Sequence, residues 1–269
     1  MKKMIKYIIP VVALFSLASC TKNTGVTNQP YDTYGTPADK GQLKVNLAFA
    51  YNIDYANLRI KLNGAYVSNL LQSRTPFPGG GYNTRGSNFA LYMSVPLGSN
   101  AVSVVMPKFG TNTDSVVLYT TSVTIPDNSP YTLHIADTAA TTKSVLVKNS
   151  IAGIPENFCR FNFVNLIPNA GAVDLYLNGV LMKSNIAYLA SSGPMDIQIG
   201  SSAPGFVSGT TTTWAVRPTG AASTTTALAS YASSNGLQNQ VALTGFCMGY
   251  SGATGTRLPY FALTLDKNQ

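Results

Sequence analysis

The sequence predicts an all-β fold of two tandem antiparallel β-sandwich domains, on the basis of a repeated strand, a composition poor in charge and closely spaced turn residues. The strand Asn57-Leu-Arg-Ile-Lys-Leu-Asn-Gly64 recurs as Ala172-Val-Asp-Leu-Tyr-Leu-Asn-Gly179. In both copies apolar and polar residues alternate, as on a strand with one buried face, and the final Asn-Gly favours a tight hairpin turn. Charged residues make up only 10% of the chain, while 23 glycines and 15 prolines supply many turns.

The first residues have the pattern of a secretory signal peptide. Lysines at positions 2, 3 and 6 precede an apolar run at residues 7–15, which is too short to span a membrane comfortably. The following Leu17-Ala-Ser-Cys20 resembles a bacterial lipobox, and this resemblance implies that residues 1–19 are removed and that Cys20 is lipidated. The alternative is an ordinary signal peptide in which the cysteine is incidental.

Residues 20–42 are expected to form a flexible tether between the lipid and the folded part. They show no apolar periodicity, and a coil of this length spans on the order of 25 Å. Thr21 follows the cysteine, and by resemblance to the bacterial sorting rule the lack of Asp there implies the outer membrane. The acidic residues that mark surface export in Bacteroidetes lipoproteins are missing from residues 21–25, so the periplasmic and the surface face both stay open.

The first domain is expected at residues 43–149, as a sandwich of the immunoglobulin-like kind. Short strands separated by turn residues favour this architecture over a parallel α/β sheet. Residues 71–87, which contain two prolines and three successive glycines, interrupt the strand pattern. The expected strands lie at residues 43–49, 58–62, 66–70, 89–95, 101–106, 115–125, 131–135 and 144–148.

A second domain is expected at residues 159–269, after a linker at residues 150–158. Cys159-Arg-Phe-Asn-Phe-Val-Asn165 matches Leu43-Lys-Val-Asn-Leu-Ala-Phe49 position by position. The repeated strand then follows at nearly the same distance, so we interpret the chain as an ancient duplication of a unit of roughly 110 residues. The second copy has its own irregular region at residues 203–226.

The second copy also resembles a known family. Arg160-Phe-Asn-Phe-Val-Asn-Leu-Ile-Pro-Asn-Ala-Gly-Ala-Val-Asp-Leu-Tyr-Leu-Asn-Gly179 is similar to the opening of domain of unknown function family 4397, as is the Ile186-Ala-Tyr188 that follows. The resemblance implies a β-sandwich protein of the cell envelope, often lipid-anchored or secreted, with no established enzymatic activity. The family's polar His, Ser and Asp positions correspond here to Asn165, Ile167 and Asn169.

Candidate catalytic and metal-binding groups are sparse. His134, the only histidine, is out of phase with its apolar neighbours and is expected to face solvent. A hydrolase would combine it with Asp137 and a serine, but no Gly-x-Ser-x-Gly elbow supports that triad. The few carboxylates suit neither paired-acid catalysis nor calcium, so Asn52-Ile-Asp54 and Asp127-Asn128 are interpreted as turns. One histidine and two cysteines are too few for a zinc site. The sequence therefore predicts no enzyme, no metal and no cofactor.

The charge of the chain bears on its partners. The formal net charge of +8 includes the three signal-peptide lysines, without which 15 basic residues face 10 acidic ones. The basic residues are scattered singly, which argues against nucleic acid as a partner. The expected partners are the membrane, through the lipid anchor, and envelope proteins or glycans.

Two cysteines, Cys159 and Cys247, remain once Cys20 is lipidated. Both are in phase with apolar neighbours, so we expect both to point into the core. An oxidising compartment permits a disulfide between them, which would stabilise the fold by about 4 kcal/mol in the chain-entropy model. The sequence leaves this bridge and two free thiols both open.

Aromatic and arginine side chains in the two irregular regions are the candidate binding groups: Phe77, Tyr82 and Arg85 in the first, and Trp214 and Arg217 in the second. They could stack on a sugar or anchor a protein, because loops on a rigid sandwich commonly carry binding. The alternative for the tryptophan is a core position. The predicted function is a non-catalytic binding or structural module of the envelope, with a carbohydrate-binding accessory lipoprotein as the first alternative and a hydrolase as a distant third.

Overall fold

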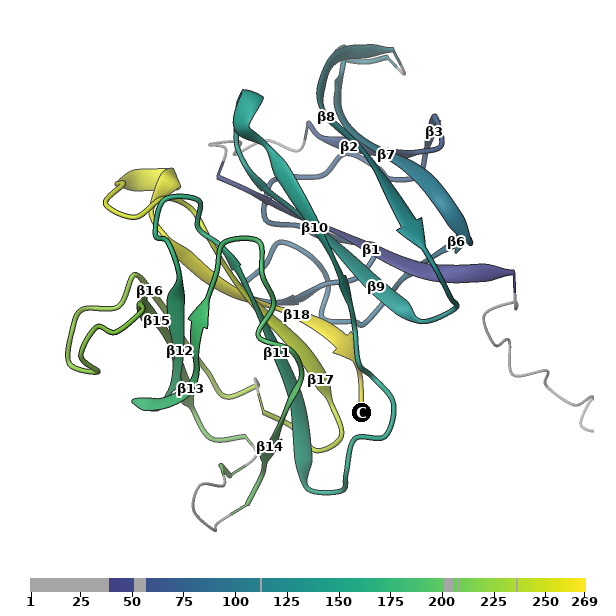
Figure 1. The fold of residues 1–269 in the computed structure, drawn as a ribbon. Helices are drawn as coiled ribbons and strands as arrows, with labels where there is room; N and C mark the ends of the chain where they lie inside the picture. Colours follow the sequence, from purple (N-terminus) through teal and green to yellow (C-terminus); the bar gives the residue numbers. More distant parts are fainter. Residues whose placement is uncertain (1–38, 51–56, 112, 201–205, 208, 236) are drawn as a thin grey trace, which may run out of the picture. The chain divides into compact units, whose positions relative to one another are not determined.

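Strands grouped into four sheets make up most of the described chain (Figure 1). The computed structural model describes residues 39–50, 57–111, 113–200, 206–207, 209–235 and 237–269. The predicted signal peptide, Cys20 and most of the predicted tether lie outside the described residues, as does Asn52-Ile-Asp54. The all-β class of sandwich type that the sequence predicts is confirmed.

Residues 39–149, here called the first half, form two sheets. The strands are β1 (Lys40–Phe49), β2 (Arg59–Leu62), β3 (Ala65–Tyr66), β4 (Pro76–Phe77), β5 (Gly81–Tyr82), β6 (Met93–Pro96), β7 (Gly98–Pro107), β8 (Asp114–Ile125), β9 (Pro130–Asp137) and β10 (Lys143–Lys148), with a 3-10 turn η1 (Ala139–Thr141). One sheet has the order β10-β9-β1-β4, with β6 also paired to β1, and the other has the order β3-β2-β7-β8. The β1 and β9 strands run parallel.

Residues 150–269, the second half, repeat this strand order. The strands are β11 (Phe158–Leu166), β12 (Val173–Leu177), β13 (Val180–Ile186), β14 (Met195–Gln198), β15 (Thr212–Pro218), β16 (Ala229–Ser233), β17 (Ala242–Met248) and β18 (Tyr260–Lys267), with a 3-10 turn η2 (Gly255–Arg257). The orders β14-β11-β17-β18 and β13-β12-β15-β16 correspond to β6-β1-β9-β10 and β3-β2-β7-β8. The parallel pair recurs as β11 and β17. The repeat inferred from the sequence therefore has a counterpart in the topology.

The two Asn-Gly hairpins form as predicted. Asn63 and Asn178 both have φ 49°, and the glycines after them have φ 86° and 82°. Each asparagine also binds the neighbouring strand, because its Oδ1 accepts a hydrogen bond of 2.8 Å from the backbone N of Ala101 or Thr213. The asparagine thus closes the turn and fastens the hairpin to the sheet.

The halves differ most between the strands β3 and β6. Residues 67–92 make this connection in the first half, whereas residues 187–194 suffice in the second. The longer connection contains β4 and β5, so the expected interruption at residues 71–87 is partly strand. β5 pairs with β18, Tyr82 facing Leu263, and so extends a sheet of the second half. The predicted division into two domains at residues 150–158 stays a prediction.

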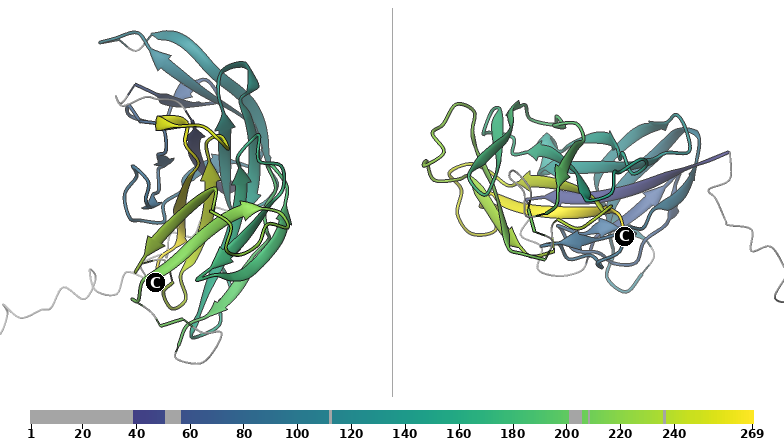
Figure 2. Two further views of the ribbon diagram at one scale, coloured as in Figure 1. Left: turned by 90° about the vertical axis from the view of Figure 1, so that its left-hand side faces the viewer. Right: turned by 90° about the horizontal axis from the view of Figure 1, so that it is seen from below.

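Three clusters of buried apolar side chains hold the sheets together. Two lie between the paired sheets of the first and of the second half, and are built on β1 and on β11. The third joins the halves, where Ala48 and Ala136 pack with Val164, Phe246 and their neighbours. Figure 2 gives two further views of these layers, with the first half in purple to teal and the second in green to yellow. Within the described residues no helix is long and apolar enough to cross a membrane.

Candidate functional site

A groove of about 680 Å³ opens at one end of the first half. Its walls are Asn57 and Arg59 at the start of β2, Leu70 after β3, and residues 106–111 at the end of β7 and in the β7–β8 hairpin. This volume lies in the usual range of ligand-binding pockets, which is about 300–1,000 Å³. The described lining is mostly apolar, and its charged residues are Arg59 and Lys108.

Arg59 is held in place by the strand pattern of β2 and by two contacts. It precedes the buried Ile60 on the strand, so its side chain points away from the core. Its Nε donates a hydrogen bond of 3.2 Å to the backbone carbonyl of Ser68. Its Cζ lies 3.9 Å from the ring centroid of Tyr66, a cation–π contact. The guanidinium is therefore positioned rather than loose.

An ion pair supports the same end of the sheet. Lys61 Nζ lies 2.6 Å from Asp114 Oδ2, and the hydroxyl of Tyr66 donates to the other oxygen of that carboxylate. The bond from Lys61, together with the bond from Tyr66, lowers the pKa of Asp114, and the bond to Asp114 raises the pKa of Lys61. Both oxygens of the Asp114 carboxylate thus accept hydrogen bonds from neighbouring side chains, one from Lys61 and the other from Tyr66.

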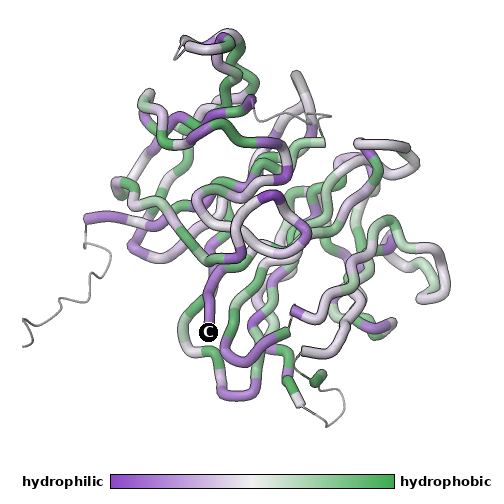
Figure 3. The backbone as a smooth tube through the Cα atoms, turned by 180° about the vertical axis from the view of Figure 1, so that it is seen from behind, coloured by the Kyte–Doolittle hydropathy of each residue, from purple (hydrophilic) through white to green (hydrophobic). Residues whose placement is uncertain are grey.

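The tip of the β7–β8 hairpin presents an aromatic ring to solvent. The backbone N of Thr111 donates to the carbonyl of Lys108 at 3.0 Å, and Gly110 has φ 69°, which closes the turn. Phe109, between them, is 100% exposed. Figure 3 shows hydrophobic positions continuing into this hairpin. The exposed ring and the apolar groove beside it form a continuous candidate surface for binding.

The candidate residues of the first irregular region have a different use. Phe77 is half-buried on β4 and packs into the first-half core, and Tyr82 is half-buried against the core of the second half. Arg85 is exposed, with its backbone N bonded to the carbonyl of Arg74. Asn83 donates to the backbone carbonyl of Phe261 at 2.7 Å. The structure therefore uses this segment to connect the halves.

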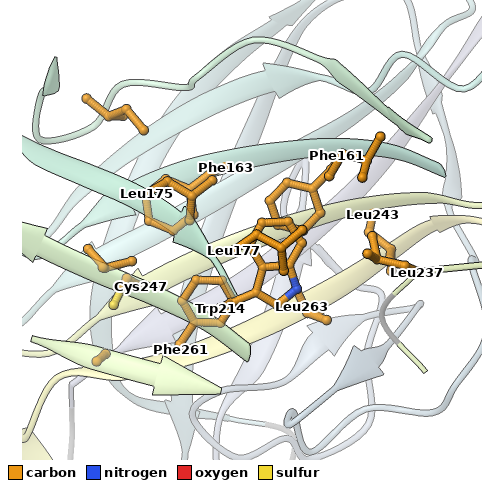
Figure 4. Close-up of a cluster of buried hydrophobic side chains, with 14 of the residues drawn as sticks. Phe161, Phe163, Leu175, Leu177, Trp214, Leu237, Leu243, Cys247, Phe261 and Leu263 are labelled. Atoms are coloured by element: carbon orange, nitrogen blue, oxygen red, sulfur yellow. The ribbon is translucent and has the colours of Figure 1, made fainter. Parts of the chain in front are cut away.

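Trp214 is not a surface platform, so its assignment as a binding residue is corrected. It has no exposed surface, and its ring stacks on Phe161 at 3.8 Å between centroids and lies 6.3 Å from Phe261 (Figure 4). On β15 it faces the core in phase with Thr212 and Val216, which the sequence had offered as the alternative. Arg217 is half-buried, lies over the ring of Tyr176 at 4.8 Å and donates to the carbonyl of Thr225 at 2.8 Å.

His134 is buried, which corrects the expectation that it faces solvent. The second half covers the face of β9 that carries this histidine, and the exposed fraction of His134 is 0%. Nδ1 accepts a hydrogen bond of 3.0 Å from Asn46 Nδ2, and the ring lies 6.0 Å from that of Phe246. Burial, reinforced by the charge of Lys44, lowers the pKa of His134 to about 3. The ring is therefore neutral and out of reach of a substrate.

A polar cluster joins the halves beside this histidine, and no pattern in the sequence predicted it. Lys44 Nζ donates to the backbone carbonyl of Leu265 at 2.5 Å, lies 3.4 Å from Asp266 Oδ1 and lies 4.5 Å from the ring centroid of Tyr92. Thr244 donates to Asp266 Oδ2 at 2.5 Å. The sequence did contain one signal, because a basic residue followed two positions later by Asn occurs on both opening strands, as Lys44 with Asn46 and as Arg160 with Asn162. Alternation alone, however, does not reveal that a polar face is covered.

The two core cysteines are buried free thiols. The inward orientation predicted for them is confirmed, whereas the disulfide that the sequence left open is absent. The register of β11 and β17 places Cys247 opposite Asn165, six positions along β11 from Cys159. At about 3.3 Å per residue this separation is near 20 Å, far beyond disulfide reach. Burial raises the pKa of the Cys159 thiol to about 12.

Asn165 and Asn169, which replace polar residues of the family pattern, are structural here. Asn165 is fully buried and its Nδ2 donates to the carbonyls of Gly171 and Ile186 at 3.1 and 3.0 Å. Asn169 exchanges two hydrogen bonds with the backbone of Ser251. Both hold the connection between β11 and β12.

The described residues do not bring together three or more His, Cys, Asp or Glu side chains that could hold a metal ion. Fold and site thus define an all-β protein of two-sheet sandwiches with an accessible groove at one end. The family described as Domain of unknown function (DUF4397) matches residues 82–176, which confirms the family resemblance predicted from the opening of the second copy. The matched segment runs from β5 to β12 and so includes part of both halves. No curated protein matches the chain.

Proposed function

We propose that this protein is a non-catalytic binding module, anchored by a lipid on Cys20 to the outer membrane, which engages its partner through the β7–β8 groove. The groove carries the proposal: it is of ligand-binding size, and Phe109 beside it is fully exposed. The lipobox-like Leu17-Ala-Ser-Cys20 supports the anchor. The burial of His134 supports a non-catalytic role, because the only histidine cannot meet a substrate.

The anchor is tested by growing cells with an alkyne-labelled fatty acid. The wild-type chain is expected to incorporate the label and to fractionate with the outer membrane. Cys20→Ala is expected to lose the label, because no thiol is left at the acceptor position. Label retained in Cys20→Ala, or no label in the wild type, would overturn the lipid anchor.

The binding role is tested by photo-crosslinking in intact cells, with a photoreactive phenylalanine analogue in place of Phe109. The matched control carries the analogue in place of Phe89, which is also exposed, at 62%, but does not line the groove. Crosslinks to discrete envelope components are expected from position 109 and not from position 89. Equal crosslinking from both positions contradicts a specific site at the groove.

A further inference from the structure

We propose that the groove and Phe109 form a docking surface for an acidic, leucine-rich segment of another protein. This inference rests on the proposed binding function and names the chemistry of the partner. The occupant is a protein segment, in preference to a small molecule or to the lipid surface, for reasons of charge, exposure and position.

The positive charge of the groove favours an acidic partner. Arg59 and Lys108 line the groove, and none of the described lining residues is acidic. Asp114, a carboxylate at the start of β8, already accepts hydrogen bonds from Lys61 and Tyr66. An incoming carboxylate therefore meets positive charge on both walls, and its attraction to them steers association.

The exposed apolar side chains at the groove favour a macromolecule over a small ligand. Phe109 is 100% exposed at the tip of the hairpin, and Leu70 on the other wall is 50% exposed. A small ligand seated in the groove could not cover a ring that projects from its rim. A protein segment can enclose the ring and fill the apolar floor, and buried aromatic anchors of this kind supply most of the binding energy at interfaces.

Position disfavours the anchoring membrane as the occupant. β8 ends at Ile125, just before β9 begins at Pro130, and Pro130 lies opposite Gln42 near the start of β1. The first described stretch of the chain begins there, at residue 39. β8 has twelve residues, so its beginning and the hairpin tip lie about 40 Å away along the strand. The groove is therefore at the opposite end of the first half from the start of β1.

The test uses the full mature chain and short fluorescein-labelled peptides, measured by fluorescence anisotropy. One peptide alternates glutamate with leucine, and its matched control has lysine in place of every glutamate. The acidic peptide is expected to bind and the basic peptide is not. Phe109→Ala should weaken binding about 30-fold, and Lys108→Glu about tenfold. Phe89→Ala and Lys183→Glu are surface controls outside the groove and should leave the affinity unchanged.

A charge-swap arm separates binding at this site from general electrostatic attraction. Lys108→Glu should gain affinity for the basic peptide, whereas Lys183→Glu should not. Equal binding of the acidic and basic peptides, or loss of binding in the Lys183→Glu control, would overturn the proposal. Circular dichroism of each variant confirms that it is folded.

A vesicle arm tests the membrane as the occupant, with vesicles of phosphatidylethanolamine and phosphatidylglycerol and the unlipidated Cys20→Ala chain. Sedimentation with the vesicles that is lost in Phe109→Ala would overturn the protein-segment proposal in favour of lipid insertion. If no peptide binds while position 109 still crosslinks specifically in cells, the acidic-segment inference fails and the binding function stands. If neither occurs, both fail.

Discussion

The same three residue types, Lys, Asp and Tyr, form a cluster twice in this molecule, once fully buried and once partly exposed. The two clusters are called the buried trio and the exposed trio. Between the halves, Lys44 pairs with Asp266 beside Tyr92, and the two charged side chains are 0% and 4% exposed. Near the groove, Lys61 pairs with Asp114 beside Tyr66, and the corresponding values are 22% and 24%. The comparison isolates the effect of burial on one chemical arrangement.

Burial reverses the direction of the pKa shifts. Desolvation lowers the pKa of Lys44 and raises that of Asp266, although each partner partly offsets this effect in the other. In the exposed pair the hydrogen bond dominates, raising the pKa of Lys61 and lowering that of Asp114. The buried trio therefore depends on complete pairing and fastens the halves, whereas the exposed trio keeps its charges in water beside the groove.

The largest expected effect comes from breaking the buried pair. Lys44→Met leaves the Asp266 carboxylate buried without its cation, and the free energy of unfolding should fall by about 3–5 kcal/mol. Urea unfolding followed by circular dichroism measures the loss. The double variant Lys44→Met with Asp266→Leu should recover most of it, because no uncompensated charge remains. A single variant as stable as the wild type would show that the pair does not join the halves.

Acid should act on the same buried region through His134. Its pKa is about 3 in the folded protein against an ordinary 6.5, so between these values the unfolded chain binds a proton that the folded chain does not. Stability is therefore lost as pH falls through this window, by about 3 kcal/mol between pH 7 and 4 from this group. Urea unfolding at a series of pH values should show a loss smaller by that amount in His134→Asn. Parallel profiles for the two proteins would contradict a buried neutral histidine.

The repeated strand offers a third test, because Asp174 occupies the position that Arg59 has in the first copy. Asp174 is 4% exposed and accepts from the backbone N of Asn185 at 2.8 Å and from the backbone N of Gly220 and the hydroxyl of Thr219 at 3.0 Å. Burial raises its pKa, but these hydrogen bonds outweigh burial and leave the pKa below its usual value. In the second half this position therefore holds a buried carboxylate bonded to its own chain, whereas in the first half it holds an arginine that lines the groove.

Asp174→Ala should lower the free energy of unfolding by about 2 kcal/mol, because buried donors lose their acceptor. Arg59→Ala at the equivalent position should cost less than about 1 kcal/mol, since the cation–π contact with Tyr66 and the hydrogen bond to the Ser68 carbonyl that it removes are both at an accessible site. Thermal unfolding of the two variants side by side gives the comparison. Equal losses of unfolding free energy in Asp174→Ala and Arg59→Ala would contradict this difference between the two equivalent positions.

The smallest effect is expected for Lys61→Met. Asp114 and Tyr66 stay accessible to water after the substitution, so the midpoint of urea unfolding should not move measurably. Raising the salt concentration should likewise leave the difference in unfolding midpoint between the wild type and Lys61→Met unchanged. A shift as large as that of Lys44→Met would end the distinction between the buried and the exposed trio.

Local pattern accounts for what the sequence could predict of the fold and the site. The alternation around Leu175 and the Asn-Gly turn are properties of a few adjacent residues, and both hairpins form as expected. The groove was missed because its walls come from Leu70 and from residues 106–111, which no local pattern connects. Phe109 lies in a turn, where a lone apolar residue carries little signal before the surrounding surface is known.

By itself, the sequence determined the all-β class, the longer strands of the first half, the two hairpins and the recurrence of the opening strands, because side-chain alternation and turn chemistry act over a few residues. It did not predict β4 and β5, which lie in the expected interruption. Only the tertiary structure decided which polar faces lose contact with water. Period-2 alternation marks two different faces of a strand, but it does not say whether another sheet covers the polar one. That covering buries Lys44, His134 and Asp266, whereas the groove end of the first half keeps Arg59 and Lys108 accessible.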